Sequence, residues 1–258
     1  MGISTRPVDG RIAVITMDYP PVNALPVDGW FAVADAVRAA GEDPAVRVVV
    51  LRAEGRGFNA GVDLKEMQRT AGFTALVGAN KGCYAAFRSI YECAVPVIAA
   101  VNGFCLGGGV GLVGNCDTVV ASEDAYFGVP EVDRGALGAA THLARLVPQH
   151  LMRTLYYTGR TIRAADLVPH GSVLEVVPRD RLDDAALAVA GEIAAKDPRV
   201  IRAAKEALNG IDPMDVNRSY RFEQGFTFEL NLAGVADEHR DAFVESGGTL
   251  ETYREGAP

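Results

Sequence analysis

Two glycine-rich loops and one carboxylate have the residue types and the spacing for chemistry in this chain of 258 residues. Residues 55–61 form the first loop and follow an apolar run at residues 48–51. Three consecutive glycines at residues 107–109 form the second loop, and they come after another apolar run at residues 97–101. Glycine lets a ligand approach the main chain closely, and a helix that starts at such a loop has unpaired N–H groups. One N–H group from each loop would stabilise a negative oxygen by roughly 3 kcal/mol per donor, and Glu131 would supply a base nearby.

The elements that must position these loops alternate between strands and helices. Continuous apolar runs are typical of strands buried on both faces, and helical spacing is found at residues 30–40 and 73–93. From residue 181 onward the pattern is helical only, so we predict an α/β fold with a helical C-terminal region from about residue 200. Further predicted elements are a hairpin at residues 3–8 and 12–17, strands at 118–121 and 172–177, a short helix at 163–167 capped by Thr161, and helices at 182–195, 200–208, 216–232 and 237–245.

Composition and charge exclude several classes of partner. The formal net charge of −8 and the lack of a concentrated basic segment argue against nucleic acid and against an anionic membrane surface. The four cysteines show no CxxC spacing and are interpreted as buried thiols in a reducing compartment. No apolar run is long enough to span a bilayer, and the N-terminus lacks a charged-then-apolar signal. We therefore expect a cytoplasmic protein without nucleic-acid or membrane partners.

The two loops and the segments around them resemble the crotonase (enoyl-CoA hydratase/isomerase) superfamily. The resemblance is carried, in chain order, by Asn23-Ala24-Leu25 and by residues 58–67, 101–109, 127–131 and 157–160. It implies a crotonase spiral of ββα units at residues 1–199 and a helical trimerisation region at residues 200–258. It also implies a homotrimer or homohexamer that acts on acyl-CoA thioesters, with CoA as part of the substrate and with no separate cofactor and no metal.

The same resemblance implies roles for particular residues. Val62 and Gly108 would supply the two N–H groups, and Glu131 the catalytic carboxylate. Asp133 is a further catalytic candidate because its charge would shift the pKa of Glu131, although it also suits a surface ion pair with Arg134. Residues expected along the CoA are Ala24, Leu25, Ala60, Asp63 and Leu64, with Lys65 and Lys205 as candidates for its phosphates or, alternatively, as solvated surface charges.

The chain departs from the family at one catalytic position. Family hydratases carry a second glutamate just after the triple glycine, and that position is Gly111 in this chain. Hydration of an enoyl thioester needs a water that is held and deprotonated by carboxylates, so simple hydratase activity is not expected. We interpret Gly111 as leaving room for a bulky ring in the substrate.

A narrower resemblance involves residues 58–63, 103–115 and 224–234. They are similar to ring-opening hydrolases of the same superfamily, which act late in actinobacterial steroid (cholesterol) breakdown on bicyclic β-diketone-like CoA thioesters. This resemblance predicts that water activated by Glu131 attacks a ring ketone and that the adjacent carbon–carbon bond breaks. The two N–H groups would then hold the enolate that remains.

Other functions remain as alternatives. A Δ3-Δ2 enoyl-CoA isomerase needs only one base and is the leading alternative, followed by a hydratase-like enzyme and by an acyl-CoA-binding protein that has lost catalysis. The literal GxGxxG at residues 109–114 suggests a nicotinamide-dependent oxidoreductase, but the next strand begins at about residue 118 and leaves no room for the required helix. His142 and His239 are interpreted as structural residues.

Overall fold

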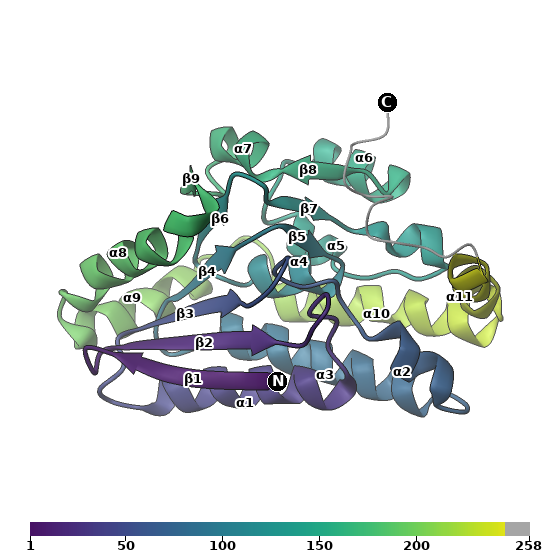
Figure 1. Ribbon diagram of the computed structural model, residues 1–258, viewed down its shortest axis with the longest axis horizontal. Coiled ribbons are helices and arrows are strands. Elements are labelled where there is room, and N and C mark those ends of the chain that lie inside the picture. Colours follow the sequence, from purple (N-terminus) through teal and green to yellow (C-terminus); the bar gives the residue numbers. More distant parts are fainter. Residues whose placement is uncertain (246–258) are drawn as a thin grey trace.

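A computed structural model describes residues 1–245, and its largest unit is a six-stranded sheet. The strand order is β1-β2-β3-β4-β6-β9, with β1 antiparallel to β2 and all other neighbours parallel. The sheet's strands are β1 (Gly2–Val8), β2 (Ile12–Asp18), β3 (Val48–Ala53), β4 (Val97–Val101), β6 (Thr118–Ser122) and β9 (Glu175–Val177). Figure 1 shows these strands in order, from β1 in the lower part of the view to β9 at the upper left.

Both faces of the central part of this sheet are covered, which is why β2, β3, β4 and β6 are mostly buried, whereas the edge strand β1 is mostly exposed. Along β2, Ile12 and Val14 face one side while Ile15 and Met17 face the other, as the two-residue period of a strand requires. Helices α1 (Val27–Glu42) and α3 (Thr74–Tyr91) cover the side of Ile15, and α8 (Leu182–Ala194) covers the side of Ile12. Parallel sheets depend on such double coverage.

A second sheet, of three short strands, brings the second glycine loop close to the turn that carries Glu131. It consists of β5 (Phe104–Leu106), β7 (Tyr126–Gly128) and β8 (Thr161–Arg163). Because β5 and β7 are parallel, their carboxyl ends meet at one edge, where the N–H of Gly107 donates to the carbonyl of Gly128 at 2.9 Å. Helix α4 (Gly108–Val113) therefore starts beside the 3₁₀ turn η1 (Pro130–Arg134).

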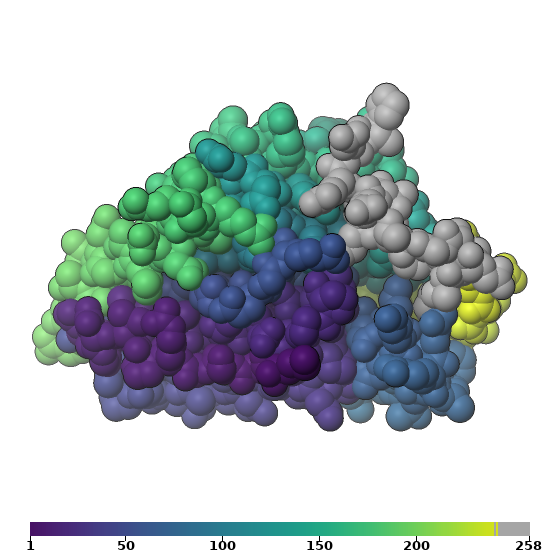
Figure 2. All heavy atoms as spheres, viewed as in Figure 1, coloured from purple at the N-terminus to yellow at the C-terminus, as the bar shows by residue number. Residues whose placement is uncertain are grey.

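The C-terminal helices α9 (Pro198–Gly210), α10 (Val216–Leu232) and α11 (Val235–Glu245) fold back onto the rest of the chain. Helix α10 packs on α3 and on the short helix α5 (Ala140–Leu143), and α11 contacts η1. In the space-filling view α11 occupies the same end of the molecule as α2 (Leu64–Arg69) (Figure 2). The remaining short elements are α6 (Gln149–Thr158), α7 (Ala164–Leu167), η2 (Val168–His170) and η3 (Arg179–Arg181).

The structure confirms the α/β class, the antiparallel hairpin of β1 and β2, and the helical C-terminal region as far as residue 245. The predicted helix cap at Thr161 is wrong, because Thr161 begins β8 and α7 starts only after Arg163. The four cysteines are buried thiols, as expected. Within residues 1–245 we find no helix long and apolar enough to cross a membrane. Residues 246–258 of the predicted trimerisation region lie outside the described residues, and the boundary near residue 200 stays a prediction.

Candidate active site

The two glycine loops, η1, α3 and α10 enclose one cavity of about 120 Å³. Its walls include Val62 from the first loop, Gly108 from the second and Glu131 from η1. Most of the remaining lining is apolar, with the rings of Phe87 and Tyr220 among it. Among the described residues that line this cavity, Glu131 is the only carboxylate.

Asn59 locks the first loop to the second. Its side chain is completely buried, and its Nδ2 donates to the carbonyl of Asn23 at 2.6 Å. Its Oδ1 accepts the N–H of Gly61 at 2.8 Å, and its own carbonyl accepts the N–H of Leu106 at 2.9 Å. One residue therefore fixes the backbone of both loops at the cavity wall.

The N–H groups of Val62 and Gly108 are left unpaired by this arrangement. The residues on either side of Val62 bond to Leu25, because Leu25 N–H donates to Gly61 and Asp63 N–H donates to Leu25, each at 2.9 Å. This parallel pairing turns the N–H of Val62 to the opposite side, and Gly108 is the first residue of α4, where a helix has no internal acceptor. Neither N–H donates a hydrogen bond to any residue within 1–245.

The first loop can approach the N–H of Gly108 closely because residue 61, at the point of contact, is a glycine. A Cβ placed on Gly61 would lie 3.3 Å from the nitrogen of Gly108. Both donors also border the cavity that Glu131 borders. Such preorganised backbone donors are the arrangement that stabilises a negative oxygen during a reaction.

The carboxylate of Glu131 lies directly against another glycine, Gly107, at the cavity. Gly107 has φ +55°, and a Cβ there would lie 2.3 Å from Oε1 of Glu131, so any other residue would displace the carboxylate. The residue as a whole is partly exposed, but its Oε2 atom is buried and has no hydrogen-bond partner among the described residues.

Burial raises the pKa of Glu131 from 4.5 to about 7, with a smaller effect in the same direction from Glu223 and Asp133 and an opposing one from Arg134. A carboxyl group with a pKa near neutrality can both accept and return a proton at neutral pH. The site is therefore able to transfer a proton beside an oxygen whose charge is stabilised by two backbone donors.

Gly111 does not leave room for a substrate ring, contrary to the interpretation drawn from the sequence. A Cβ on Gly111 would lie 2.1 Å from the ring of Phe87, so this aromatic side chain occupies the space of the absent glutamate. Phe87 is held in an aromatic cluster, with ring centroids 5.7 Å from Trp30, 4.7 Å from His142 and 5.1 Å from Tyr220. The space in which the side chain of a second carboxylate would stand is therefore filled by Phe87, which is part of the apolar wall.

The structure separates the predicted CoA-binding residues into two groups. Ala60 and Leu64 line the cavity together with Val62, Gly108 and Glu131. Four others are not part of the lining. Leu25 is fully buried behind Val62, and Asp63 caps α2 by accepting the N–H groups of Lys65 and Glu66. Ala24 is half-buried, and Lys65 is exposed.

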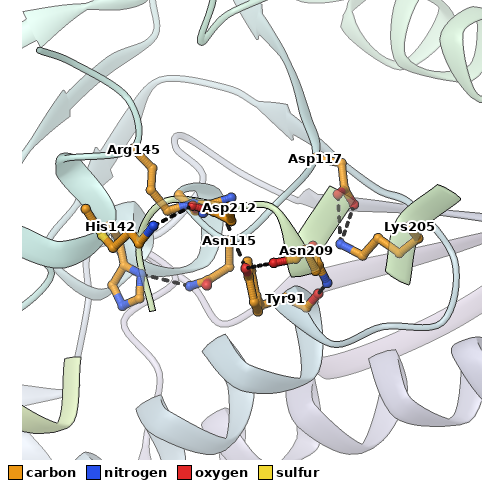
Figure 3. A network of polar contacts seen from close by, with 10 residues as sticks. Tyr91, Asn115, Asp117, His142, Arg145, Lys205, Asn209 and Asp212 are labelled. Carbon is orange, nitrogen blue, oxygen red and sulfur yellow. Dashed lines mark hydrogen bonds and ion pairs between the residues drawn. The ribbon is translucent and has the colours of Figure 1, made fainter. Parts of the chain in front are cut away.

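Two predicted site residues lie away from the cavity lining. Lys205 is buried and its Nζ lies 2.7 and 2.9 Å from the two carboxylate oxygens of Asp117, an ion pair seen in Figure 3, so it is not placed to bind a phosphate. Asp133 is exposed and lies beside Gly159. The charge of Asp133 raises the pKa of Glu131, which is the role that the sequence suggested for it.

His142 is a structural residue, as interpreted from the sequence. It is 1% exposed, and its Nδ1 lies 3.0 Å from Nδ2 of Asn115, a contact that Figure 3 shows beside the ion pair of Arg145 and Asp212. Burial lowers the pKa of His142 to about 3, so the ring is neutral at physiological pH.

Sequence reasoning missed the contribution of α10 to the cavity. Tyr220, Thr227 and Asn231 line it, and Glu223 is buried behind the lining. The signal was present in the sequence, because Glu223, Thr227 and Asn231 recur at the four-residue spacing of one helix face.

Comparison with known proteins identifies a family and relatives that are similar along nearly the whole chain. Residues 8–248 match the family described as enoyl-CoA hydratase/isomerase. The chain is 74% identical over 242 residues to the (7aS)-7a-methyl-1,5-dioxo-2,3,5,6,7,7a-hexahydro-1H-indene-carboxyl-CoA hydrolase of Mycobacterium tuberculosis, covering 94% of this chain and 98% of the relative. It is 68% identical over 247 residues to the protein of the same name from Rhodococcus jostii, covering 96% of each. An enoyl-CoA hydratase/isomerase structure from Xanthobacter autotrophicus superposes with a TM-score of 0.85 at 30% identity, covering 95% and 92% of the two chains.

The raised pKa of Glu131 predicts a pH-dependent effect of Glu131→Gln on stability. A carboxyl whose folded-state pKa is raised favours folding below pH 4.5 and loses that contribution as pH rises through about 7. Relative to the wild type, Glu131→Gln should therefore gain up to about 3 kcal/mol in free energy of unfolding between pH 4.5 and pH 8. Urea unfolding at both pH values measures this, with the exposed Glu229→Gln as control. An equal effect of Glu131→Gln at the two pH values would contradict the prediction.

Replacement of Lys205 and replacement of Lys65 should have opposite effects on stability and on KM. Lys205→Met leaves Asp117 without its cation and should lower the free energy of unfolding by about 3 kcal/mol, with no change in KM for a CoA thioester. Lys65→Met removes an exposed charge and should leave stability unchanged while raising KM. Thermal unfolding and steady-state kinetics on both variants measure these effects, and a raised KM for folded Lys205→Met would restore Lys205 to the binding site.

Proposed function

The chain belongs to the enoyl-CoA hydratase/isomerase family, and we propose that within it the chain is a hydrolase that opens a ring of a bicyclic keto acyl-CoA thioester. One observation carries the proposal: a single carboxylate with a pKa near 7 shares an apolar cavity with two unpaired backbone N–H groups. The name of the relatives at 74% and 68% identity supports it, since it specifies hydrolysis of a fused-ring dione attached to CoA.

The reaction proceeds from water and a ring ketone. Ionised Glu131 takes a proton from the water while the water oxygen bonds to the ketone carbon. The tetrahedral adduct then breaks the adjacent ring carbon–carbon bond, which leaves a carboxylic acid on one side and an electron pair on the other. That pair delocalises as an enolate, and the N–H groups of Val62 and Gly108 stabilise its oxygen. Glu131 returns its proton to carbon, so the product has gained the elements of one water.

The cavity argues against a simple hydratase. Hydration in this family uses a second carboxylate, and Phe87 fills the space in which it would stand. A Δ3-Δ2 isomerase needs only Glu131 and the two N–H groups, so it remains the alternative. The hydrolase is preferred because the two relatives carry that function in their name.

The substrate and the cellular role follow from the same proposal. Ala60 and Leu64 at the cavity would contact the pantetheine part of the CoA, with Ala24, Leu25 and Asp63 supporting the loops and Lys65 at the phosphates. A fused dione of this kind is what remains of a steroid nucleus, so the enzyme would act in steroid (cholesterol) degradation in the cytoplasm.

The exposed face of α10 supports assembly as a homotrimer or a pair of homotrimers. Phe222, Phe226 and Leu232 are 73%, 42% and 71% exposed, and the rings of Phe222 and Phe226 meet edge to face with their centroids 5.3 Å apart. Adjacent exposed aromatic side chains of this kind usually mark a protein–protein interface.

Glu131→Gln should lower turnover of the cyclic dione CoA thioester by about 100-fold or more, because the amide keeps the shape but cannot accept the proton. Binding should change little, since the donors to the thioester oxygen are backbone groups. Reaction in ¹⁸O-labelled water should place the label in a new carboxylate while the CoA thioester stays intact. Label in an alcohol supports a hydratase, release of free CoA supports a thioesterase, and double-bond migration without label supports the isomerase. Near-normal turnover by Glu131→Gln would remove Glu131 from the mechanism.

Light scattering of the purified protein at micromolar concentration should give three or six times the chain mass of 27.3 kDa. The paired change Phe222→Asp and Phe226→Asp should shift this mass toward the monomer by charging the exposed face of α10. A monomeric wild type would refute the assembly.

A further inference from the structure

The loop at residues 135–139, between η1 and α5, forms the cavity wall opposite the glycine loops. Ala136, Leu137, Gly138 and Ala139 all line the cavity. The loop leaves η1 directly after the turn that carries Glu131, so its position and that of the carboxylate depend on each other. The Cγ of Glu131 lies 3.7 Å from the point where a Cβ on Gly138 would be.

Helix α10 holds this loop through buried polar side chains. Glu223 accepts the N–H of Ala140 at 2.8 Å through Oε1 and the N–H of Thr141 at 3.1 Å through Oε2. One turn further on, Thr227 Oγ1 donates to the carbonyl of Leu137 at 2.5 Å. Figure 1 shows α10 lying alongside α5, the helix whose first two N–H groups Glu223 accepts.

The contact with Glu223 stabilises an unfavourable backbone conformation. Ala139 has φ +60°, in the left-handed region, which costs a non-glycine residue on the order of 1 kcal/mol or more. Ala139 also stands at the N-cap of α5 and has no side chain that can accept a hydrogen bond there. The carboxylate of Glu223 takes over this capping role from another helix, and both of its oxygens are used.

A hydroxyl extends the connection from Glu223 toward Glu131. The hydroxyl of Tyr156 donates to Glu223 Oε1 at 3.4 Å and accepts the N–H of Gly138 at 3.1 Å. Gly138 in turn faces the side chain of Glu131, and both residues line the cavity. Hydrogen bonds therefore run from Glu223 through Tyr156 to the backbone beside the proposed base.

We propose that Glu223 is a positioning residue that holds the wall at residues 138–141 and, through this wall, sets the orientation of Glu131. The proposal rests on the proposed function, in which Glu131 is the base. Glu223 is not among the described residues that line the cavity.

The charges around Glu131 allow this role to be measured. On η1 itself, Arg134 lowers the pKa of Glu131 and Asp133 raises it; from α10, Glu223 raises it. The other titratable groups that face Glu131 are Cys83 on α3, Tyr156 on α6 and Tyr220 on α10, and burial raises the pKa of each, so they are neutral at physiological pH. Burial raises the pKa of Glu223 itself, while the N–H groups of Thr141 and Ala140 lower it. Glu223 is thus the acidic group from a separate helix whose removal changes the electrostatic environment of Glu131.

The experiment compares Glu223→Gln with Glu229→Gln, which removes an exposed carboxylate from the same helix. Glu223→Gln should lower kcat by about tenfold to hundredfold because the base is misplaced, with KM changed less than kcat. The midpoint of the pH dependence of kcat should move to lower pH. Glu229→Gln should match the wild type in both respects. Thr227→Val removes a loop contact without removing charge, so it should lower kcat and leave the midpoint in place.

The outcomes separate this inference from the proposed function. If Glu131→Gln loses turnover but Glu223→Gln behaves like Glu229→Gln, the positioning role is wrong and the proposed function stands. If Glu131→Gln keeps turnover, both are overturned. Should Glu223→Gln not fold, Tyr156→Phe removes only the connecting hydroxyl and should lower kcat without raising KM. Wild-type kcat in Tyr156→Phe would then overturn the inference.

Discussion

The site depends on keeping two backbone N–H groups unpaired while holding them still. Buried N–H groups normally find acceptors, and a loop free to relax would pair them. Asn59 prevents this by engaging both loops at once, through its amide and its own carbonyl. The second sheet adds the bond from Gly107 to Gly128, so the start of α4 is fixed from two directions. The main sheet and its covering helices serve as the rigid frame for these few bonds.

Burial is the main cause of the unusual proton affinity of the Glu131 carboxylate. Its Oε2 atom has no hydrogen bond within the described residues, and most of the cavity wall around it is apolar. Burial disfavours its charge and brings its pKa near neutrality. The same apolar wall suits a fused-ring substrate, so one physical cause adjusts both the base and the specificity of the cavity.

The sequence was sufficient for features that depend on local pattern. Apolar runs identified β3 and β4, and the glycine loops with Glu131 identified residues that the structure brings to one cavity. It was insufficient where contacts are distant in sequence. The strands β5, β7 and β8 have three residues each, too few to show a period, and Glu223 meets Ala140 across 83 residues. A buried lysine such as Lys205 has no local pattern that distinguishes it from a solvated one.

The contact between Phe87 and Gly111 has a consequence for how this sequence is able to change. A glutamate at residue 111 would collide with the ring, and a smaller residue at position 87 alone would leave a void in the core. Each single step is therefore unfavourable, whereas both changes together would remove the collision. The two positions lie on different helices and are epistatic, because the effect of a substitution at one depends on the residue at the other. This steric conflict separates a site with one carboxylate from a site with two.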